Sequence, residues 1–288
     1  MKGIILAAGK GTRLYPMTKP VCKPLLPVYD KPLIYYSIAV LMEADIRDIM
    51  IIIPPEEEQT FRKLLGDGSA FGVQITYAVQ YVARGIADAF LVAEDFVQGD
   101  CACLILGDNI FYAKDLREKL MQAASNPNGA TVFGYYVDDP RAFGVVEFDE
   151  NGTAISLEEK PKHPKSNYII PGLYFYDADV LALAKTLQPS ARGELEITDL
   201  NRLYLESGKL QVIPLESDFV WMDAGTADSL LESAQTIKQI QDDTGRNVAC
   251  LEEIAYRHGY LSEAQVNQAG QTLQSTLYGQ YLQCISAE

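Results

Sequence analysis

Residues 1–13 read MKGIILAAGKGTR, and this stretch decides the fold. A short apolar run predicts a buried strand over residues 3–7, and the run breaks directly into a loop of small residues. Ala8, Gly9 and Gly11 let a ligand come close to the backbone, because glycine adopts positive φ at little cost. Successive backbone N–H groups in such a loop hold phosphate oxygens, and Arg13 adds a planar cation suited to phosphate. The stretch therefore predicts a strand followed by a phosphate-binding loop.

The first half of the chain alternates between predicted strands and helices. The uninterrupted β-branched run at 48–53 and the sequences at 74–78 and 102–106 predict strands, and helical periodicity is found at 33–44, 56–65 and 86–94. This alternation is typical of a parallel sheet covered by helices on both faces. Ligands of such sheets bind beyond the carboxyl ends of the strands. The loop at 9–13 and the sequence Gly107-Asp108-Asn109 both follow predicted strands, so both are expected at that edge.

After about residue 130, short strands separated by turns predict an antiparallel or mixed extension of the sheet, with helices at 178–187 and 197–207. We therefore expect an α/β fold with a Rossmann-like, mostly parallel but mixed sheet flanked by helices, a small β extension and a C-terminal helical segment. The predicted catalytic domain covers 1–228, with a nucleotide half at about 1–110 and a sugar-binding half at about 111–228. The helical segment covers 229–288.

The composition limits the partners of this chain. Its formal net charge is −15, so we expect no nucleic-acid binding, which depends on lysines and arginines at phosphates. A phosphate ligand then needs a local cluster of cations, a metal ion, or both. No apolar run approaches the roughly 18 residues of a membrane span, and no signal peptide is predicted. Five cysteines, an odd number, favour free thiols in a reducing, cytoplasmic compartment. Cys101 and Cys103 are expected to pack rather than bind metal.

The sequence of the glycine loop disfavours two other known types of phosphate-binding loop, the nicotinamide-binding loop and the Walker A loop. The nicotinamide fingerprint G-x-G-x-x-G has Leu14 at its third glycine position, and the second strand runs into Pro54 without the expected acidic residue. A Walker A loop needs G-K-[ST] after four spacer residues, which is absent here. An oxidoreductase and a P-loop enzyme are therefore poor candidates.

Charged residues elsewhere can each have either an ordinary structural role, as a solvated side chain or a helix cap, or a role in binding a ligand. Lys23 lies between Pro20 and Pro24, where it is either a solvated lysine or a phosphate contact on a stiff segment. Asp108 and Asp223 each end an apolar run, and each is either a helix cap or a metal ligand. Two carboxylates at one ligand edge fit Mg²⁺ held together with substrate oxygens.

The run at 158–161 is either a solvated surface or part of a sugar site. In strict strand alternation, Glu159 points one way while Glu158 and Lys160 point the other. A glutamate accepts hydrogen bonds from two sugar hydroxyls, and a lysine holds a sugar phosphate. Arg192, just before a predicted helix, is a helix cap, a surface residue or a further phosphate contact.

Taken together, these segments resemble the sugar-1-phosphate nucleotidylyltransferases over nearly the whole chain. Besides the first loop, the resemblance is carried by KPLLPVYDKPLIYY, LILGDNIFY, FGVVEFDENGTAISLEEKP, PSARGELEITDLNRLYLE and WMDAGT. Members of the family that act on dTTP and glucose 1-phosphate are the most similar. The resemblance implies that a phosphate oxygen of glucose 1-phosphate attacks the α-phosphorus of dTTP, with Mg²⁺ as cofactor, forming dTDP-glucose and pyrophosphate.

The resemblance also implies roles for individual residues. The implied catalytic residues are Arg13, Lys23, Asp108, Lys160 and Asp223, of which Asp108 and Asp223 would bind Mg²⁺. The implied nucleotide contacts are Leu6, Ala8, Gly9, Gly11, Thr12, Arg13, Gln80, Gly85 and Asp108. The implied contacts to the sugar phosphate are Asn109, Gly144, Glu159, Lys160, Gly172, Tyr174, Arg192 and Trp221.

The departures from the family pattern concern mainly the base site. Pro24 stands where relatives usually have a glutamine that touches the nucleoside, and Arg84 lies in a segment that usually reads P-x-G-L-A-x-A. UTP, or a broad choice of pyrimidine, is therefore the alternative to dTTP. A rival of another class is a catalytically silent sugar-nucleotide sensor. The helical tail resembles that of relatives that form homotetramers, are inhibited by the end product at a second site, and supply deoxysugars such as dTDP-rhamnose for polysaccharides.

Overall fold

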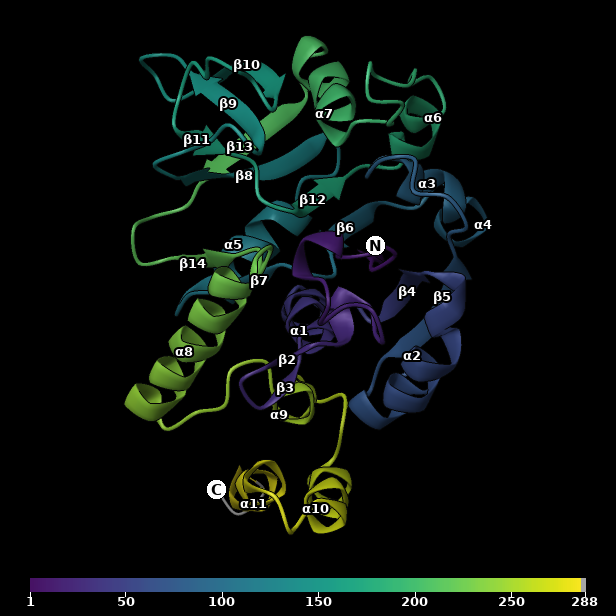
Figure 1. The fold of residues 1–288 in the computed structure, drawn as a ribbon, viewed down its shortest axis with the longest axis vertical. Coiled ribbons are helices and arrows are strands. Elements are labelled where there is room, and N and C mark those ends of the chain that lie inside the picture. Colours follow the sequence, from purple (N-terminus) through teal and green to yellow (C-terminus); the bar gives the residue numbers. More distant parts are fainter. Residues whose placement is uncertain (286–288) are drawn as a thin grey trace.

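The computed structural model describes residues 1–285 and is built around one mixed, ten-stranded sheet (Figure 1). Its strands follow the order β10-β9-β11-β8-β12-β6-β1-β4-β5, and β13 pairs with β8 beside this path. One half of the sheet is parallel and the other half is mainly antiparallel. The predicted fold class, an α/β fold with a mixed sheet flanked by helices, is confirmed.

The parallel half contains the strands predicted from the first 110 residues. These are β1 (Lys2–Leu6), β4 (Asp48–Ile53), β5 (Gln74–Val79) and β6 (Ala102–Leu106), and β1 lies between β4 and β6. The helices of this half are α1 (Ile34–Glu43), α2 (Glu58–Leu65), α3 (Asp88–Val92) and α4 (Glu94–Val97). The helix predicted at 86–94 is thus two short helices. Because these four strands are parallel, their carboxyl ends lie at one edge.

The mixed half begins where β12 (Leu173–Tyr176) pairs antiparallel with β6. Beyond it lie β8 (Ala130–Tyr136), β9 (Gly144–Phe148), β10 (Ala154–Glu159), β11 (Tyr168–Ile169) and β13 (Leu210–Pro214). The helices here are α5 (Leu116–Ala124), α6 (Val180–Ala184) and α7 (Ile197–Glu206). Two small antiparallel pairs lie outside the main sheet: β2 (Pro27–Val28) with β3 (Lys31–Pro32), and β7 (Ile110–Tyr112) with β14 (Val220–Met222). The antiparallel extension predicted after residue 130 is therefore present.

The hydrophobic core lies on both faces of the sheet, as the uninterrupted apolar strands predict. On one face Ile5 and Ile105 pack with the apolar side of α1, and on the other Ile4 and Leu104 pack with residues of α3 and α7. Cys103 belongs to the first of these clusters. All five cysteines are free, as expected. None of the described helices is long and apolar enough to cross a membrane.

The C-terminal part consists of α8 (Ala227–Thr244), α9 (Leu251–Arg257), α10 (Glu263–Thr272) and α11 (Leu277–Ile285). Helix α8 starts with a capping box between Thr226 and Ser229, next to the predicted boundary at 228/229, which stays a prediction. Helix α9 packs against α1, and its Leu251 and Ile254 belong to the main core. Helices α10 and α11 lie at the end of the molecule opposite β9 and β10 (Figure 1). Residues 286–288 of the predicted segment lie outside the described residues.

Candidate active site

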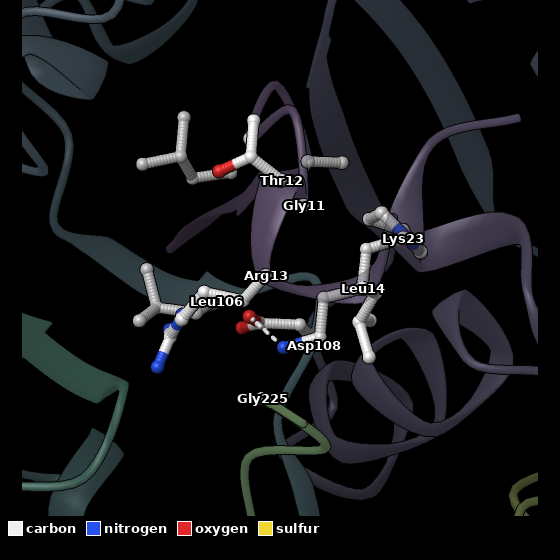
Figure 2. A pocket seen from close by; sticks show the side chains of 12 residues that line it. Gly11, Thr12, Arg13, Leu14, Lys23, Leu106, Asp108 and Gly225 are labelled. Atoms are coloured by element: carbon white, nitrogen blue, oxygen red, sulfur yellow. Dashed lines mark hydrogen bonds and ion pairs between the residues drawn. The ribbon is translucent and has the colours of Figure 1, made fainter. Parts of the chain in front are cut away.

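A first cavity of about 270 Å³ opens at the carboxyl edge of the parallel strands, at the ends of β1 and β6 (Figure 2). The predicted phosphate loop forms one wall and the segment after β6 forms another. Of the residues predicted to contact nucleotide, this cavity brings together Leu6, Gly9, Gly11, Thr12, Arg13 and Asp108. Lys23 and Pro24 line it as well, together with Ala7, Leu14, Leu106 and Gly225. Ala8 is buried and does not line the cavity.

The two loop glycines have different structural reasons. Gly11 has a φ of 57°, and a Cβ added there would lie 3.1 Å from both Lys23 Cβ and Thr18 Cγ2. Gly9 meets nothing within 4 Å, so a side chain there would extend into open space beside the cavity. The Thr18 hydroxyl donates to the Gly11 carbonyl at 2.7 Å and holds the turn. Gly11 therefore shapes the loop, and Gly9 leaves room for a ligand.

Lys23 joins three segments that are distant in sequence. Its side chain is only 8% exposed, and its Nζ lies 2.6 Å from Asp108 Oδ2 and 2.5 Å from the Asp223 backbone oxygen. The residue opens a 3-10 turn, η2 (Lys23–Leu25), whose second residue is Pro24. A stiff, buried segment thus delivers the ammonium to the ligand edge, which supports the functional interpretation of this lysine over that of a solvated one.

A second cavity of about 240 Å³ adjoins the first, since Arg13, Leu106 and Asp108 line both. It lies between the parallel strands and the mixed half of the sheet. Seven of the eight residues predicted to contact sugar phosphate line it: Asn109, Gly144, Glu159, Lys160, Gly172, Tyr174 and Trp221. Asp223 lines it too. Tyr174 is buried on β12, and this burial raises the pKa of its hydroxyl above the ordinary range.

Asn109 organises the floor of this second cavity. Its Oδ1 accepts from the Trp221 indole nitrogen at 2.7 Å and from the Gly172 backbone N–H at 3.1 Å. Its Nδ2 donates to Asp108 Oδ1 at 2.9 Å. A Cβ on Gly172 would lie 2.9 Å from Asn109 Oδ1, so only glycine permits this approach. Asn109 therefore links the carboxylate at the end of β6 to the opposite wall.

The alternation expected at 158–161 is wrong at Lys160. Strand β10 ends at Glu159, and Lys160 has a φ of 45°, so the period of two does not extend to it. Both Glu159 and Lys160 consequently line the second cavity. Glu159 Oε2 accepts from the Thr198 hydroxyl at 2.5 Å. Thr198 is a cavity residue that the sequence analysis missed, because nothing in the local pattern distinguishes it from an ordinary helical threonine.

Arg192 is the one predicted sugar-phosphate contact outside the lining of the second cavity. Its guanidinium pairs with Glu159 at 3.1 Å, Glu194 at 3.3 Å and Glu196 at 2.7 Å. Glu196, not Arg192, is the N-cap of α7, which excludes a cap role for the arginine. Its proposed phosphate contact therefore stays a prediction.

The cap interpretation also fails for both aspartates. Asp108 is followed by the strand β7 rather than by a helix, and the N-cap of α8 is Thr226 rather than Asp223. Asp223 Oδ1 instead accepts from the Gly225 N–H at 3.0 Å. Two carboxylates at one cavity offer the hard oxygen ligands that Mg²⁺ prefers. Within residues 1–285, no larger cluster of three or more histidine, cysteine or acidic side chains has a metal-binding arrangement.

Gln80 and Gly85 lie outside the lining of both cavities but at the same edge of the sheet. Gln80 directly follows β5, two strands away from β1. Gly85 has a φ of 101°, and a Cβ there would lie 2.4 Å from the Leu195 carbonyl oxygen. The segment around Gly85 is thus pressed against the loop that precedes α7, and no other residue type fits.

Comparison of the chain with known proteins accounts for the arrangement of these residues. Residues 2–240 match the family model of nucleotidyl transferases. The chain belongs to the nucleotidyl transferase family. It is 55% identical to the glucose-1-phosphate thymidylyltransferase of Neisseria meningitidis serogroup A over 98% of each chain. It is 52% identical to that of Xanthomonas campestris pv. campestris over 99% of this chain and 97% of the relative.

Solved structures agree with this placement. A Bacillus anthracis protein assigned as a glucose-1-phosphate thymidylyltransferase, solved in complex with a sucrose, is 47% identical and superimposes with a TM-score of 0.76, covering 82% of this chain and 94% of that one. A UDP-glucose pyrophosphorylase in complex with UDP-glucose has the same fold at 22% identity, with a TM-score of 0.71 over 83% of this chain and 98% of that one. The predicted resemblance is confirmed. As a nucleotidyl transferase the chain is an enzyme, and the family generally uses a divalent cation.

Proposed function

We propose that this enzyme transfers a thymidylyl group from dTTP to α-D-glucose 1-phosphate, forming dTDP-glucose and pyrophosphate. The observation that carries the proposal is the pair of adjoining cavities that share Arg13, Leu106 and Asp108. One cavity has a glycine loop suited to phosphates, and the other has carboxylate, amide and aromatic groups suited to a sugar. A direct transfer needs such a junction, because the two substrates must react without a covalent enzyme intermediate.

The reaction is a displacement at the α-phosphorus. A phosphate oxygen of glucose 1-phosphate forms a new bond to the α-phosphorus. At the same time the bond between the α-phosphorus and the oxygen that bridges to the β-phosphate breaks, and pyrophosphate leaves with the electron pair of that bond. Positioning and charge neutralisation dominate such transfers. Arg13 lines both cavities and would hold the triphosphate and the departing pyrophosphate. Lys23 would neutralise the reacting phosphates, and Lys160 would hold the sugar phosphate.

Asp108 and Asp223 fit a divalent cation by their chemistry and by lining the same cavity. We propose that they hold Mg²⁺, which supplies positive charge to the phosphate oxygens when bound. Lys23 is the cation that compensates Asp108 in the structure. Lys23, Asp108 and Asp223 together carry one net negative charge when all three are ionised, so a divalent cation at the junction has a carboxylate charge left to neutralise.

We propose that Gln80 and Gly85 contact the pyrimidine. Neighbouring strands lie about 4.8 Å apart, so the end of β5, two strands from β1, lies about 10 Å from the phosphate loop. That separation suits a base joined through its sugar to the triphosphate. Pro24 lines the first cavity without a side-chain donor or acceptor, and this observation favours UTP as the second candidate substrate.

The C-terminal helices suggest assembly and regulation. A third cavity of about 720 Å³ lies between α1, β7 and α9, and its lining includes Lys114, Arg117, Arg246 and Arg257. We propose that it is the second, regulatory sugar-nucleotide site and that the chain forms a homotetramer. Light scattering that gives a monomer mass would exclude the tetramer. Unchanged rates in the presence of dTDP-rhamnose would exclude feedback inhibition.

The decisive assay measures pyrophosphate release with Mg²⁺ and glucose 1-phosphate, comparing kcat/KM for dTTP and UTP. A strong preference for dTTP supports the proposal. Equal values would make the enzyme a general pyrimidine sugar nucleotidylyltransferase. No turnover with either nucleotide would favour a sugar-nucleotide sensor. Lys160→Ala is expected to raise KM for glucose 1-phosphate, and unchanged kinetics would remove Lys160 from the site.

A further inference from the structure

Asp88 is a buried carboxylate that none of the roles assigned above uses. It is the first residue of α3, it has no exposed surface, and it lies behind Gln80 rather than in either cavity. The Gln80 Nε2 donates to Asp88 Oδ2 at 2.8 Å. The other oxygen, Oδ1, lies 2.9 Å from a terminal guanidinium nitrogen of Arg84. An aspartate in such surroundings needs its partners, because an unpaired buried charge is costly.

The backbone holds these residues in place. The Leu195 N–H donates to the Arg84 carbonyl at 2.6 Å, and the Ala87 N–H donates to the Leu195 carbonyl at 3.1 Å. The Gln80 N–H donates to the Ile53 carbonyl at 2.9 Å, which fixes Gln80 at the end of β5. Arg84 and Asp88 therefore approach Gln80 from a segment that backbone hydrogen bonds tie to Leu195.

The contact with Asp88 determines which end of the Gln80 amide is presented to a ligand. An ionised carboxylate only accepts hydrogen bonds, so only the amide NH₂ of Gln80 can face it. The amide oxygen then points elsewhere, and in residues 1–285 the Gln80 side chain has no hydrogen bond apart from that to Asp88. Arg84 pairs with the other oxygen, Oδ1, and so helps to hold the carboxylate in the orientation that meets Gln80. A ligand beside Gln80 therefore meets the amide oxygen, a hydrogen-bond acceptor, because the NH₂ donor is directed at Asp88.

We propose that Asp88 is a positioning residue that fixes the Gln80 amide so that the site accepts bases with an N–H at ring position 3 and rejects cytosine. Thymine and uracil carry that N–H, whereas cytosine has a bare nitrogen acceptor there. If the Gln80 amide oxygen faces the bare ring nitrogen of cytosine, both acceptors stay unpaired. Sites that bind a substrate through a hydrogen bond strongly reject analogues that cannot form it. The inference rests on the proposed function, since it requires Gln80 to face the base.

Calorimetric binding of dTTP and dCTP, without sugar phosphate, tests the inference on Asp88→Asn. The asparagine offers either an oxygen or an NH₂, so the Gln80 amide is free to take both orientations. We expect dTTP to bind more weakly, dCTP to bind more tightly, and the ratio of their Kd values to fall by about tenfold. In a Gln80→Leu background, Asp88→Asn should change the ratio no further, because it acts through Gln80.

A matched control is Asp177→Asn. Asp177 is also a buried aspartate, 4% exposed, and it accepts from the Tyr204 hydroxyl at 2.7 Å. It follows β12, next to the start of β6, and so lies at the opposite edge of the sheet. This variant can lose thermal stability, but its dTTP to dCTP ratio should equal that of the unmodified chain.

The outcomes separate the inference from the proposed function. An unchanged ratio in folded Asp88→Asn, with dTTP still turned over, overturns the role of Asp88 alone. No binding or turnover of dTTP by the unmodified enzyme overturns both. If Asp88→Asn does not fold, Arg84→Gln decides, because its side chain is 59% exposed and should tolerate replacement. Loss of that ion pair should lower the ratio about threefold, and no change would overturn the inference.

Discussion

Replacing Lys23 by methionine tests the centre of the proposed mechanism. The substitution removes the charge while keeping most of the apolar stem. At an effective dielectric constant of about 20, a unit charge that develops on the leaving oxygen about 4 Å from the ammonium is stabilised by roughly 4 kcal/mol. Because each 1.4 kcal/mol is about tenfold in rate, we expect kcat to fall by about 10³. The KM for dTTP should change much less, since the stabilised charge develops in the transition state.

The structure also predicts the effect of this substitution on folding. Asp108 would lose its ion pair with Lys23, but its side chain is 33% exposed and can be rehydrated. The expected loss is therefore about 1 kcal/mol, which corresponds to about 2 °C in Tm for a chain of this size. Such a change leaves the protein folded at assay temperature, so the loss of rate can be attributed to the missing charge.

The assay is the initial rate of pyrophosphate release with saturating Mg²⁺, dTTP and glucose 1-phosphate. Lys19→Met is the matched control, because Lys19 lies on the same connection and is exposed. It should keep kcat within about twofold of the unmodified enzyme. The reasoning about Lys23 is refuted if folded Lys23→Met retains kcat within tenfold. It is also refuted if the control loses as much activity.

Three further predictions follow from the same structure. Gly11→Ala should lower the free energy of unfolding by about 1–2 kcal/mol in thermal melts, because φ is 57°, whereas Gly9→Ala should leave Tm unchanged and raise KM for dTTP. Asn109→Ala should lower the free energy of unfolding by about 2–3 kcal/mol and raise KM for glucose 1-phosphate, since three hydrogen bonds are lost. Unaltered kinetics would contradict the role of Asn109 in organising the second cavity. Burial acts to raise the pKa of Asp45, but hydrogen bonds from Arg117, Tyr260 and His258 outweigh it and lower the pKa to about 2. The stabilisation from this carboxylate is present above its unfolded pKa near 4 and is lost as pH falls towards 2, so the difference in stability between the unmodified chain and Asp45→Asn should shrink over that range in acid titrations.

Much of the fold was predictable because the signals for it are local. The β-branched run at 48–53 and the apolar run at 102–106, with helical periods between them, indicate a buried parallel sheet without any knowledge of contacts. The position of the phosphate loop follows too, since a glycine loop directly after a strand of such a sheet must lie at its carboxyl edge. The residues expected in the sugar site depended on resemblance to a family, and most of them do line one cavity.

The sequence alone therefore determined the sheet, the ligand edge and the family, because strand periodicity, turn residues and motif order are properties of the chain itself. Only the tertiary structure decided which charges meet. Lys23 meets the Asp108 carboxylate across 85 positions and the Asp223 backbone oxygen across 200, and Asp88 reaches Gln80 from a separate element. It also decided that Lys160, with its left-handed backbone, lines the second cavity together with Glu159. Contacts of this kind depend on how distant elements pack, and no local period encodes them.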